Sequence, residues 1–306
     1  MLTLTLESDT NNEYKDPGVP KEKTPFQLQM ARFGHNRIAI AALVLMIIII
    51  LTAIFAEQLT TFNPIKLNAK ARLTAPNSEY WFGTDAMGRD VFTRILYGGK
   101  VSLWIGLAAV ILSLIIGVPL GLLSGYVGGF LDNLIMRFMD LILAFPGIIF
   151  AIWLVSMLGP GVNQVIFAIA FWDLPSFSRI VRGSVLSIKS IDYIQASRAL
   201  GANPLRVMFT HVLPNVIAPV IVMASLAISG SILSASTLSF LGLGAQPPTP
   251  EWGLMLSDGR PYLRQAWWLM VFPGAMITLF VLASNIFGDG LRDALYPRTA
   301  DRKSVV

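Results

Sequence analysis

Five long stretches of this chain contain no Asp, Glu, Lys or Arg, and no other feature constrains the fold as strongly. They cover residues 38–56, 101–131, 141–172, 207–250 and 265–288, about half of the chain. Of the 306 residues, 54% are hydrophobic and only 13% are charged. A helix needs about 20 mostly apolar residues to cross a bilayer. The sequence therefore predicts a polytopic membrane protein and excludes a soluble enzyme, a nucleic-acid-binding domain and a disordered chain.

Glycine and proline divide these stretches into six predicted transmembrane helices. Gly159-Pro160-Gly161 interrupts one stretch, and the segment from Gly242 to Pro248 ends another. The predicted spans are about 38–56, 101–126, 133–158, 162–181, 214–240 and 266–288. We expect an all-α membrane protein with four parts. These are an N-terminal tail (1–37), a first helix with its external loop (38–98), a core transmembrane domain (99–290) and a C-terminal tail (291–306).

Basic residues indicate how the spans are oriented. The segment 178–206 carries five Lys or Arg against one Asp, and the C-terminal tail is also basic. Six spans place both termini on one side, so the positive-inside rule predicts that both are cytoplasmic. The long loop 57–100, with six basic and four acidic residues, is a partial exception. Before the first span, Phe26, Met30 and Phe33 recur at helical spacing, which indicates either a helix on the membrane surface or an extension of the span.

Glycines recur at every fourth position along the second predicted span and the residues after it, at Gly117, Gly121, Gly125 and Gly129. This spacing gives a flat stripe that another helix can approach closely. We predict a packing seam with a neighbouring span or a partner. The alternative is that glycine is simply frequent in membrane helices.

Two carboxylates fall within the predicted spans. For Asp140 we favour an ion pair with Arg137, one turn away. Asp173 has no base near it in sequence, so a structural role and a place on a substrate path both stay open. An ion-coupled carrier that uses Asp173 is one rival function. An intramembrane enzyme is another, but His35 and His211, the only histidines, have no carboxylate within a turn.

The chain lacks the sequence features of a subunit that hydrolyses ATP. It contains no G-x-x-x-x-G-K-[ST] phosphate loop. It also contains no Cys, which excludes thiolate metal sites and thiol catalysis. If the chain takes part in driven transport, we expect the energy to come from another subunit.

The basic segment at about 182–213 reads as two short helices. Asp192 is a predicted N-cap, with Gln195 completing a loose capping box. Gly201 suits the left-handed position after a helix. Asn203 can cap a second helix that starts with Pro204, and Pro214 is expected to break that helix before the fifth span. The first helix carries the small residues Ala196, Ser197 and Ala199, so it could enter a groove on another protein; an ordinary amphipathic connector is the alternative.

This segment resembles the EAA loop of permease subunits in binding-protein-dependent ABC importers. The family pattern is EAA, three residues, Gly, nine residues and Ile-x-Leu-Pro. Here Gln195-Ala196-Ser197, Gly201 and Leu213-Pro214 stand at the matching positions, with Gln195 replacing Glu, Ser197 replacing Ala and His211 replacing Ile. The resemblance implies that the helix around Asp192, Gln195, Ala196, Ser197, Leu200 and Gly201 couples this chain to an ATPase.

Three further blocks extend the resemblance over roughly residues 25–298. Residues 82–90 (FGTDAMGRD) resemble the first external loop of dipeptide and oligopeptide permeases, and residues 238–259 resemble the second. Residues 288–293 resemble the C-terminal end of that family. The chain is thus similar to the C permease subunit of peptide/nickel-type importers (DppC/OppC/GsiD-like). The external motif residues are Gly83, Thr84, Asp85, Gly88, Arg89, Asp90, Glu251 and Trp252.

The resemblance implies a MetI-like transmembrane domain in a bacterial or archaeal cytoplasmic membrane. The implied partners are a homologous B-type permease, two ATPase subunits that bind ATP and Mg²⁺, and an extracytoplasmic substrate-binding protein. The chain itself would hold no cofactor and catalyse no reaction. The implied cargo is di- or oligopeptides, with nickel, glutathione or oligosaccharides as alternatives.

The charged residues of the external motifs allow three interpretations. Asp85, Arg89, Asp90, Glu251 and Asp258 could cap backbone N–H groups, contact the binding protein or hold a metal ion. Carboxylates in turn-rich segments often accept backbone hydrogen bonds. We favour the structural role, then docking of the binding protein at the long loop 57–100, and metal binding last.

Overall fold

The structure, a computed structural model, describes residue 31 and residues 33–296, and every regular element in this part of the chain is a helix. Of the predicted tails, residues 1–30, 32 and 297–306 lie outside the described residues, and so does half of the predicted surface helix at 26–37. The last helix reaches Leu295 and so takes up the first residues of the predicted C-terminal tail. The helices are α2 (Arg37–Ile54), α3 (Ala56–Leu59), α4 (Val91–Val127), α5 (Gly129–Leu143), α6 (Gly147–Leu158), α7 (Val162–Ile188), α8 (Asp192–Ala199), α9 (Pro204–Val207), α10 (Leu213–Phe240), α11 (Trp252–Gly259) and α12 (Trp268–Leu295).

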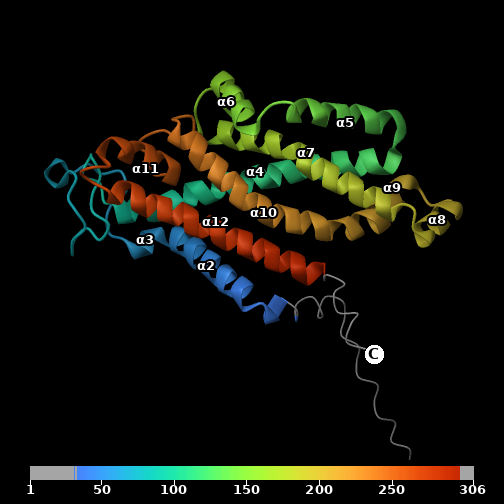
Figure 1. Ribbon diagram of the computed structural model, residues 1–306, viewed down its shortest axis with the longest axis horizontal. Coiled ribbons are helices and arrows are strands. Elements are labelled where there is room, and N and C mark those ends of the chain that lie inside the picture. The colour runs from blue at the N-terminus through green and yellow to red at the C-terminus, as the bar shows by residue number, and fades with distance from the viewer. Residues whose placement is uncertain (1–30, 32, 297–306) are drawn as a thin grey trace, which may run out of the picture.

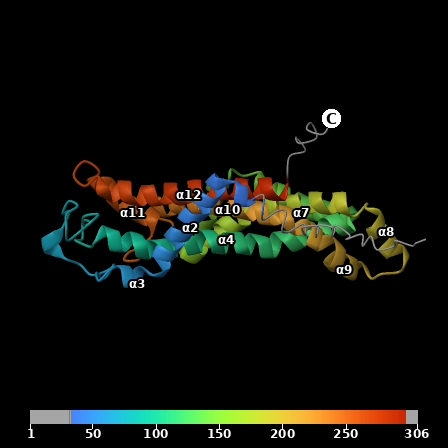
Figure 2. The same ribbon diagram turned by 90° about the horizontal axis from the view of Figure 1, so that it is seen from below.

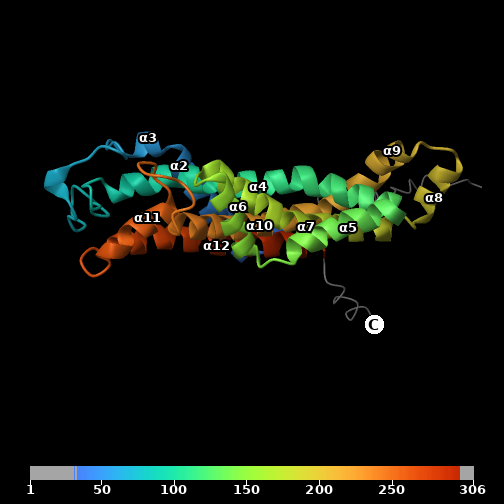
Figure 3. The ribbon, with the colours of Figure 1, turned by 90° about the horizontal axis from the view of Figure 1, so that it is seen from above.

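The long helices run along one axis and form an elongated bundle (Figure 1). The short helices α8 and α9 lie at one end, while α11 and the segment between α3 and α4 lie at the other (Figures 1 and 3). Helix α2 packs beside α12 at the edge of the bundle in Figure 1 and crosses the bundle diagonally in the view of Figure 2. Helix α4 packs along α7. The fold therefore places the predicted coupling segment and the predicted external motifs at opposite ends of the bundle.

Five helices are long and apolar enough to span a membrane, which agrees with five of the six predicted spans. They are Arg37–Ile54, Val91–Val127, Val162–Ile188, Pro204–Phe240 and Trp268–Leu295. Helix α4 begins at Val91, ten residues before the predicted start of the second span. Asp90 caps it, because its carboxylate accepts from the Thr93 N–H at 2.7 Å.

The prediction of one continuous third span at 133–158 is wrong. This region forms α5 and α6, which meet at an angle of 89°. Pro146 stands immediately before α6, and a proline disfavours helical geometry in the residue that precedes it. The break was not visible in the sequence because residues 141–158 are almost all apolar. The permitted total is six spans only if the bent pair α5–α6 is taken as one span.

The prediction that Pro214 breaks the helix before the fifth span is also wrong. A π turn at Met208–Val212 joins α9 to α10, and the Leu213 N–H bonds to the Met208 carbonyl. Pro214 stands in the first turn of α10, and the helix continues through it. A π turn changes the backbone pairing locally, so the missing N–H of Pro214 does not stop the chain from remaining helical.

The predicted glycine seam is present, and the surface that it packs against is α7. A Cβ built on Gly121 would lie 2.4 Å from the Ser178 carbonyl oxygen, and Gly117 and Gly125 also face α7 closely. Gly129 departs from the prediction, since it is the first residue of α5, with a φ of +62°, and has no neighbour within 4 Å of a built Cβ. The stripe therefore serves helix packing at three of its four positions.

Replacing Gly121 with leucine should destabilise the bundle strongly, because α4 would have to move away from the α7 backbone. Forcing extra atoms into a packed interior costs about 1–3 kcal/mol, and contact with backbone leaves little room for relief. The matched control is Gly183→Leu on α7, since a Cβ there meets nothing within 4 Å. The thermal midpoint of the purified protein should fall for Gly121→Leu and stay near the wild-type value for the control; equal midpoints would contradict the seam.

Candidate functional site

The predicted coupling segment forms a short helix exposed at one end of the bundle. Helix α8 carries Asp192, Gln195 and Ala196 on its exposed surface, with Ser197 partly buried. The Leu200 side chain after it is 89% exposed. Gly201 has a φ of +80°, and the Asn203 side chain caps α9 by accepting from the Leu205 N–H at 2.9 Å. The predicted helix end, second cap and Pro204 start are all confirmed.

Gln195 does not act as predicted. Asp192 is the first residue of α8, and the Gln195 amide donates to the Ser190 carbonyl at 2.9 Å instead of returning to the Asp192 backbone. The loose capping box is therefore wrong. A side-chain amide carries donors as well as an acceptor, and here a donor closes the preceding turn.

Helix α8 is fixed to the bundle by one buried side chain and one polar contact. Ile194 is completely buried among residues of α4, α7, α9 and α10. The Tyr193 hydroxyl accepts from the Asn215 amide at 3.1 Å, which ties α8 to the start of α10. Next to α8, Lys189 donates to the Gly125 carbonyl of α4 at 2.8 Å. A displacement of α8 would therefore be passed directly to three long helices.

At the opposite end, Asp85 organises the turn before α4. Its carboxylate accepts from the Met87 N–H at 2.8 Å and the Arg89 N–H at 3.0 Å, and it pairs with the Arg89 guanidinium at 2.6 Å. Gly88 in this turn has a φ of +73°, and a Cβ there would lie 1.8 Å from the Asn68 carbonyl oxygen. The carboxylate thus satisfies backbone donors, as the structural interpretation predicts.

Arg94 connects the two segments that the sequence predicts to be external, although they are far apart in sequence. It is 2% exposed and donates to the Pro64 carbonyl at 2.9 Å and the Pro248 carbonyl at 3.3 Å. Its guanidinium also lies 3.6 Å from the Asp85 carboxylate. A buried guanidinium needs such acceptors, since an unpaired buried charge is very costly. Arg94 therefore joins the loop before α4 to the loop before α11.

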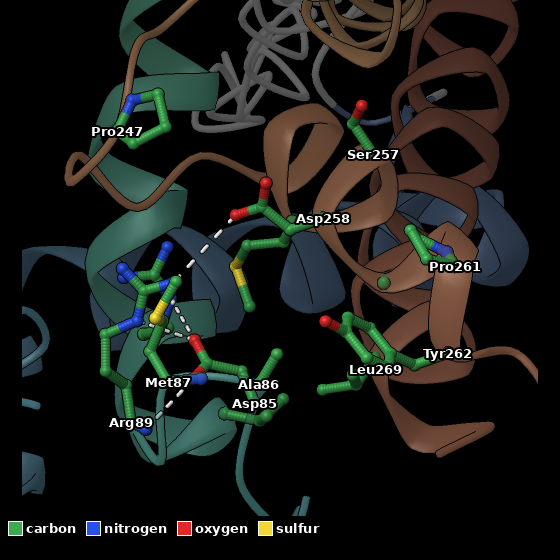
Figure 4. Close-up of a pocket in the computed structure, with 14 residues that line it drawn as sticks. Asp85, Ala86, Met87, Arg89, Pro247, Ser257, Asp258, Pro261, Tyr262 and Leu269 are labelled. Atoms are coloured by element: carbon green, nitrogen blue, oxygen red, sulfur yellow. Dashed lines mark hydrogen bonds and ion pairs between the residues drawn. The ribbon is translucent and has the colours of Figure 1, made fainter. Parts of the chain in front are cut away.

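A pocket of about 350 Å³ lies between the Asp85 turn and α11 (Figure 4). Arg89 reaches across it and lies 3.9 Å from the Asp258 carboxylate. Burial raises the pKa of the Asp258 carboxyl above its usual range, against the opposing effect of Arg94 and Arg89. Two guanidiniums and two carboxylates share this pocket, so its charge is balanced internally.

Glu251 and Trp252 hold α11 against α4. Glu251 is fully buried and caps α11 through the Gly253 and Leu254 N–H groups at 2.9 and 2.8 Å, while Ser102 of α4 donates to it at 2.9 Å. Burial raises the pKa of the Glu251 carboxyl, although these hydrogen bonds oppose the shift. The Trp252 indole donates to the Ile95 carbonyl at 3.0 Å.

The remaining external motif residues also make structural contacts. Thr84 is fully buried, and its carbonyl accepts from the Trp268 indole at 3.1 Å. Gly83 has a φ of +72°, and a Cβ there would lie 2.7 Å from the Thr74 carbonyl oxygen. Among residue 31 and residues 33–296, no three His, Asp or Glu side chains are grouped to hold a metal ion. The contacts therefore support the structural role that the sequence favoured.

Sequence reasoning missed Arg94, Ser102 and Trp268 at this end. Arg94 offered one signal, because a single charge inside an otherwise apolar helical turn requires a buried partner. Ser102 and Trp268 offered none, since serine and tryptophan are both common in membrane helices.

The two carboxylates within the spans are placed differently from one another. Asp140 pairs with Arg179 of α7 at 2.6 Å, so the predicted partner Arg137 is wrong while the ion-pair role is confirmed. Asp173 is half-buried in the middle of α7 and accepts from the Ser231 hydroxyl of α10 at 3.1 Å.

The sequence matches two known family profiles. Residues 117–301 match the family described as "Binding-protein-dependent transport system inner membrane component". Residues 24–76 match the "N-terminal TM domain of oligopeptide transport permease C". The chain belongs to this permease family. It is a transport permease subunit, a non-enzymatic component of the membrane, and its family implies ATPase and substrate-binding protein partners.

Curated relatives match the permease over nearly its whole length. "Dipeptide transport system permease protein DppC" of Alkalihalophilus pseudofirmus is 46% identical over 90% of each chain. "Di/tripeptide transport system permease protein DppC" of Pseudomonas aeruginosa is 45% identical over 87% of this chain and 90% of its own. "Glutathione transport system permease protein GsiD" of Pectobacterium atrosepticum is 42% identical over 90% of this chain and 92% of its own.

A solved structure confirms the expected fold of the permease. A chain from "Inward facing conformations of the MetNI methionine ABC transporter" aligns with a TM-score of 0.55, covering 66% of this chain and 96% of its own. The identity is 18%, so the likeness concerns the fold. The permease has the MetI-like transmembrane architecture that the sequence predicted.

Proposed function

We propose that this permease forms one half of the path by which an ABC importer brings di- or oligopeptides into a bacterial or archaeal cell. A homologous B-type permease supplies the other half. Two ATPase subunits bind ATP and Mg²⁺ at the end of the bundle that carries α8. A substrate-binding protein delivers cargo to the opposite end, near the loop between α3 and α4. The relatives described as dipeptide and di/tripeptide permeases support this cargo.

The observation that carries the proposal is the attachment of α8. This helix is exposed and short, yet Ile194 and Tyr193 fix it to one end of the long helices. Closure of the ATPase pair would push on α8 and move α4, α7 and α10 together, as a rigid-body switch between two states. Both termini and α8 then face the cytoplasm, in agreement with the basic residues at 178–206.

The proposal predicts that uptake depends on ATP and on the binding protein. In proteoliposomes that contain both permeases and both ATPases, labelled dipeptide should accumulate only with internal ATP and external binding protein. An uncoupler that collapses the proton gradient should leave uptake unchanged. Uptake by this chain alone, abolished by the uncoupler and indifferent to ATP, would overturn the proposal and favour the ion-coupled carrier.

A further inference from the structure

Asp173 occupies an unusual position for a carboxylate. It is the twelfth residue of the 27-residue helix α7, about 17 Å from the Val162 end and about 22 Å from the Ile188 end at 1.5 Å per residue. This places it near the centre of the membrane-spanning segment. A charge at that depth is costly when it faces lipid, and such residues usually face a bundle interior or a water-filled cavity.

Within the described residues, the partners of Asp173 do not neutralise it. Ser231 donates one hydrogen bond to Oδ2 at 3.1 Å. No Lys or Arg side chain in the described part of the chain lies within ion-pair distance of it. A carboxylate offers about four acceptor positions on its two oxygens. Asp173 therefore retains unused acceptor capacity at the depth where a cation would be most strongly attracted.

The carboxylate faces a pocket of about 330 Å³ between α7 and α10. Its lining combines small and hydroxyl-bearing side chains with aromatic and aliphatic ones. Its lining includes Ser176, Gly230, Ser234, Trp172, Met223 and Leu226. Gly230 is exposed, and a Cβ built there meets nothing within 4 Å, so space lies directly in front of it.

The groove between α2 and α4 provides a contrast on the same molecule. It holds about 400 Å³ and its walls are almost entirely aliphatic and aromatic, as suits acyl chains; Met46, Ile50 and Leu107 are typical of them. The pocket at Asp173 combines a carboxylate, hydroxyls and an exposed glycine instead. Its composition suits a surface that faces water or a peptide.

We propose that Asp173, held by Ser231, binds the ammonium group of a peptide as it crosses the membrane through the pocket between α7 and α10. This inference rests on the proposed function, because it assumes that this face lines the path. An ammonium carries three donors and no acceptor, so it complements a carboxylate with free lone pairs. The apolar walls formed by Trp172, Met223 and Leu226 accommodate the adjoining side chain. The volume lies within the range of about 300–1,000 Å³ typical of small-ligand sites.

The first test measures whether the pocket is wet and selects cations. The chain contains no Cys, so Ser234→Cys introduces its sole thiol, and the partner subunits are used as cysteine-free variants. The assembled importer is treated with a cationic trimethylammonium methanethiosulfonate and an anionic sulfonate analogue, and each rate is divided by that reagent's rate with a free thiol. The cation should react about tenfold faster, as expected for a nearby carboxylate, and adding Asp173→Asn should remove this preference.

The second test separates substrate recognition from a structural role. Asp173→Asn preserves shape and can still accept from Ser231, so the importer should assemble normally while dipeptide uptake falls about tenfold, the effect of one lost charge-assisted hydrogen bond. Gly230→Leu, which fills the pocket without an internal clash, should also reduce uptake. Loss of co-purification of the two permeases in Asp173→Asn would overturn the inference and point to a basic residue of the partner.

Two outcomes of the labelling test would also overturn the inference. Equal normalised rates for the two reagents would mean that no anionic site lies in the pocket. Failure of both reagents to react would mean that lipid or protein covers it. Neither result would contradict the proposed function, which is overturned only if uptake proves independent of ATP and of the binding protein.

Discussion

Replacing Gly201 with valine should reduce uptake strongly while the permease still folds and inserts. Gly201 has a φ of +80° and joins α8 to α9, and a Cβ there meets nothing within 4 Å. The expected effect is therefore conformational rather than steric. A side chain in the left-handed region costs about 1–2 kcal/mol, and more for a β-branched residue. A valine would leave this region and change the direction of α8 relative to its anchors, so ATP hydrolysis would no longer drive transport.

The matched control for Gly201→Val is Gly201→Asn, because asparagine tolerates the left-handed region. Uptake should fall by about tenfold or more in the valine variant, as follows from a strain of about 1–2 kcal/mol, and should stay within about twofold of wild type with asparagine. Both variants should reach the membrane in normal amounts. A valine variant with binding-protein-stimulated ATP hydrolysis and uptake at wild-type levels would show that α8 does not need this geometry.

The backbone of the predicted coupling segment could be predicted because its residues specify local geometry. Gly201, Asn203 and Pro204 each favour one position at a helix end, and the structure places all three as expected. The same local reasoning failed at Pro146 and Pro214. A proline can end a helix, kink it or stand in a first turn, and the surroundings decide among these. Pro146 separates α5 from α6, whereas the π turn before Pro214 lets the helix continue.

Contacts between distant residues were not predictable from one sequence. Arg94 and Pro248 lie 154 positions apart, and Asp173 and Ser231 lie 58 apart. Local spacing suggested Arg137 as the ion-pair partner of Asp140. The packing of α5 against α7 instead places Arg179 beside the Asp140 carboxylate. The glycine stripe predicted close packing correctly, but the identity of the opposing helix required the fold. Sequence patterns thus indicated which residues needed partners, and tertiary packing determined which partners they found.

Glu251→Ala should produce the largest loss of stability at the end of the bundle opposite α8. The fully buried carboxylate receives hydrogen bonds from the Gly253 and Leu254 N–H groups and from Ser102. Its removal deletes the cap of α11, worth about 1 kcal/mol, and leaves buried donors unpaired at about 1–3 kcal/mol each. It also cuts one of the links between α11 and α4, so the pocket between the Asp85 turn and α11 should become loose.

The measurement is the thermal midpoint of the purified importer, with Glu79→Ala as the matched control, since Glu79 is exposed in the loop between α3 and α4. Glu251→Ala should lower the midpoint below that of the wild type, because the lost cap and the unpaired donors reduce the free energy of unfolding. The Glu79 variant should match wild type. The midpoint of Glu251→Gln should lie between those of wild type and Glu251→Ala. The glutamine amide oxygen still accepts from the α11 N–H groups, while its NH₂ group meets a donor. A Glu251→Ala midpoint equal to that of the control would mean that Trp252 and the apolar contacts alone hold α11. The buried carboxylate would then contribute nothing to joining α11 to α4.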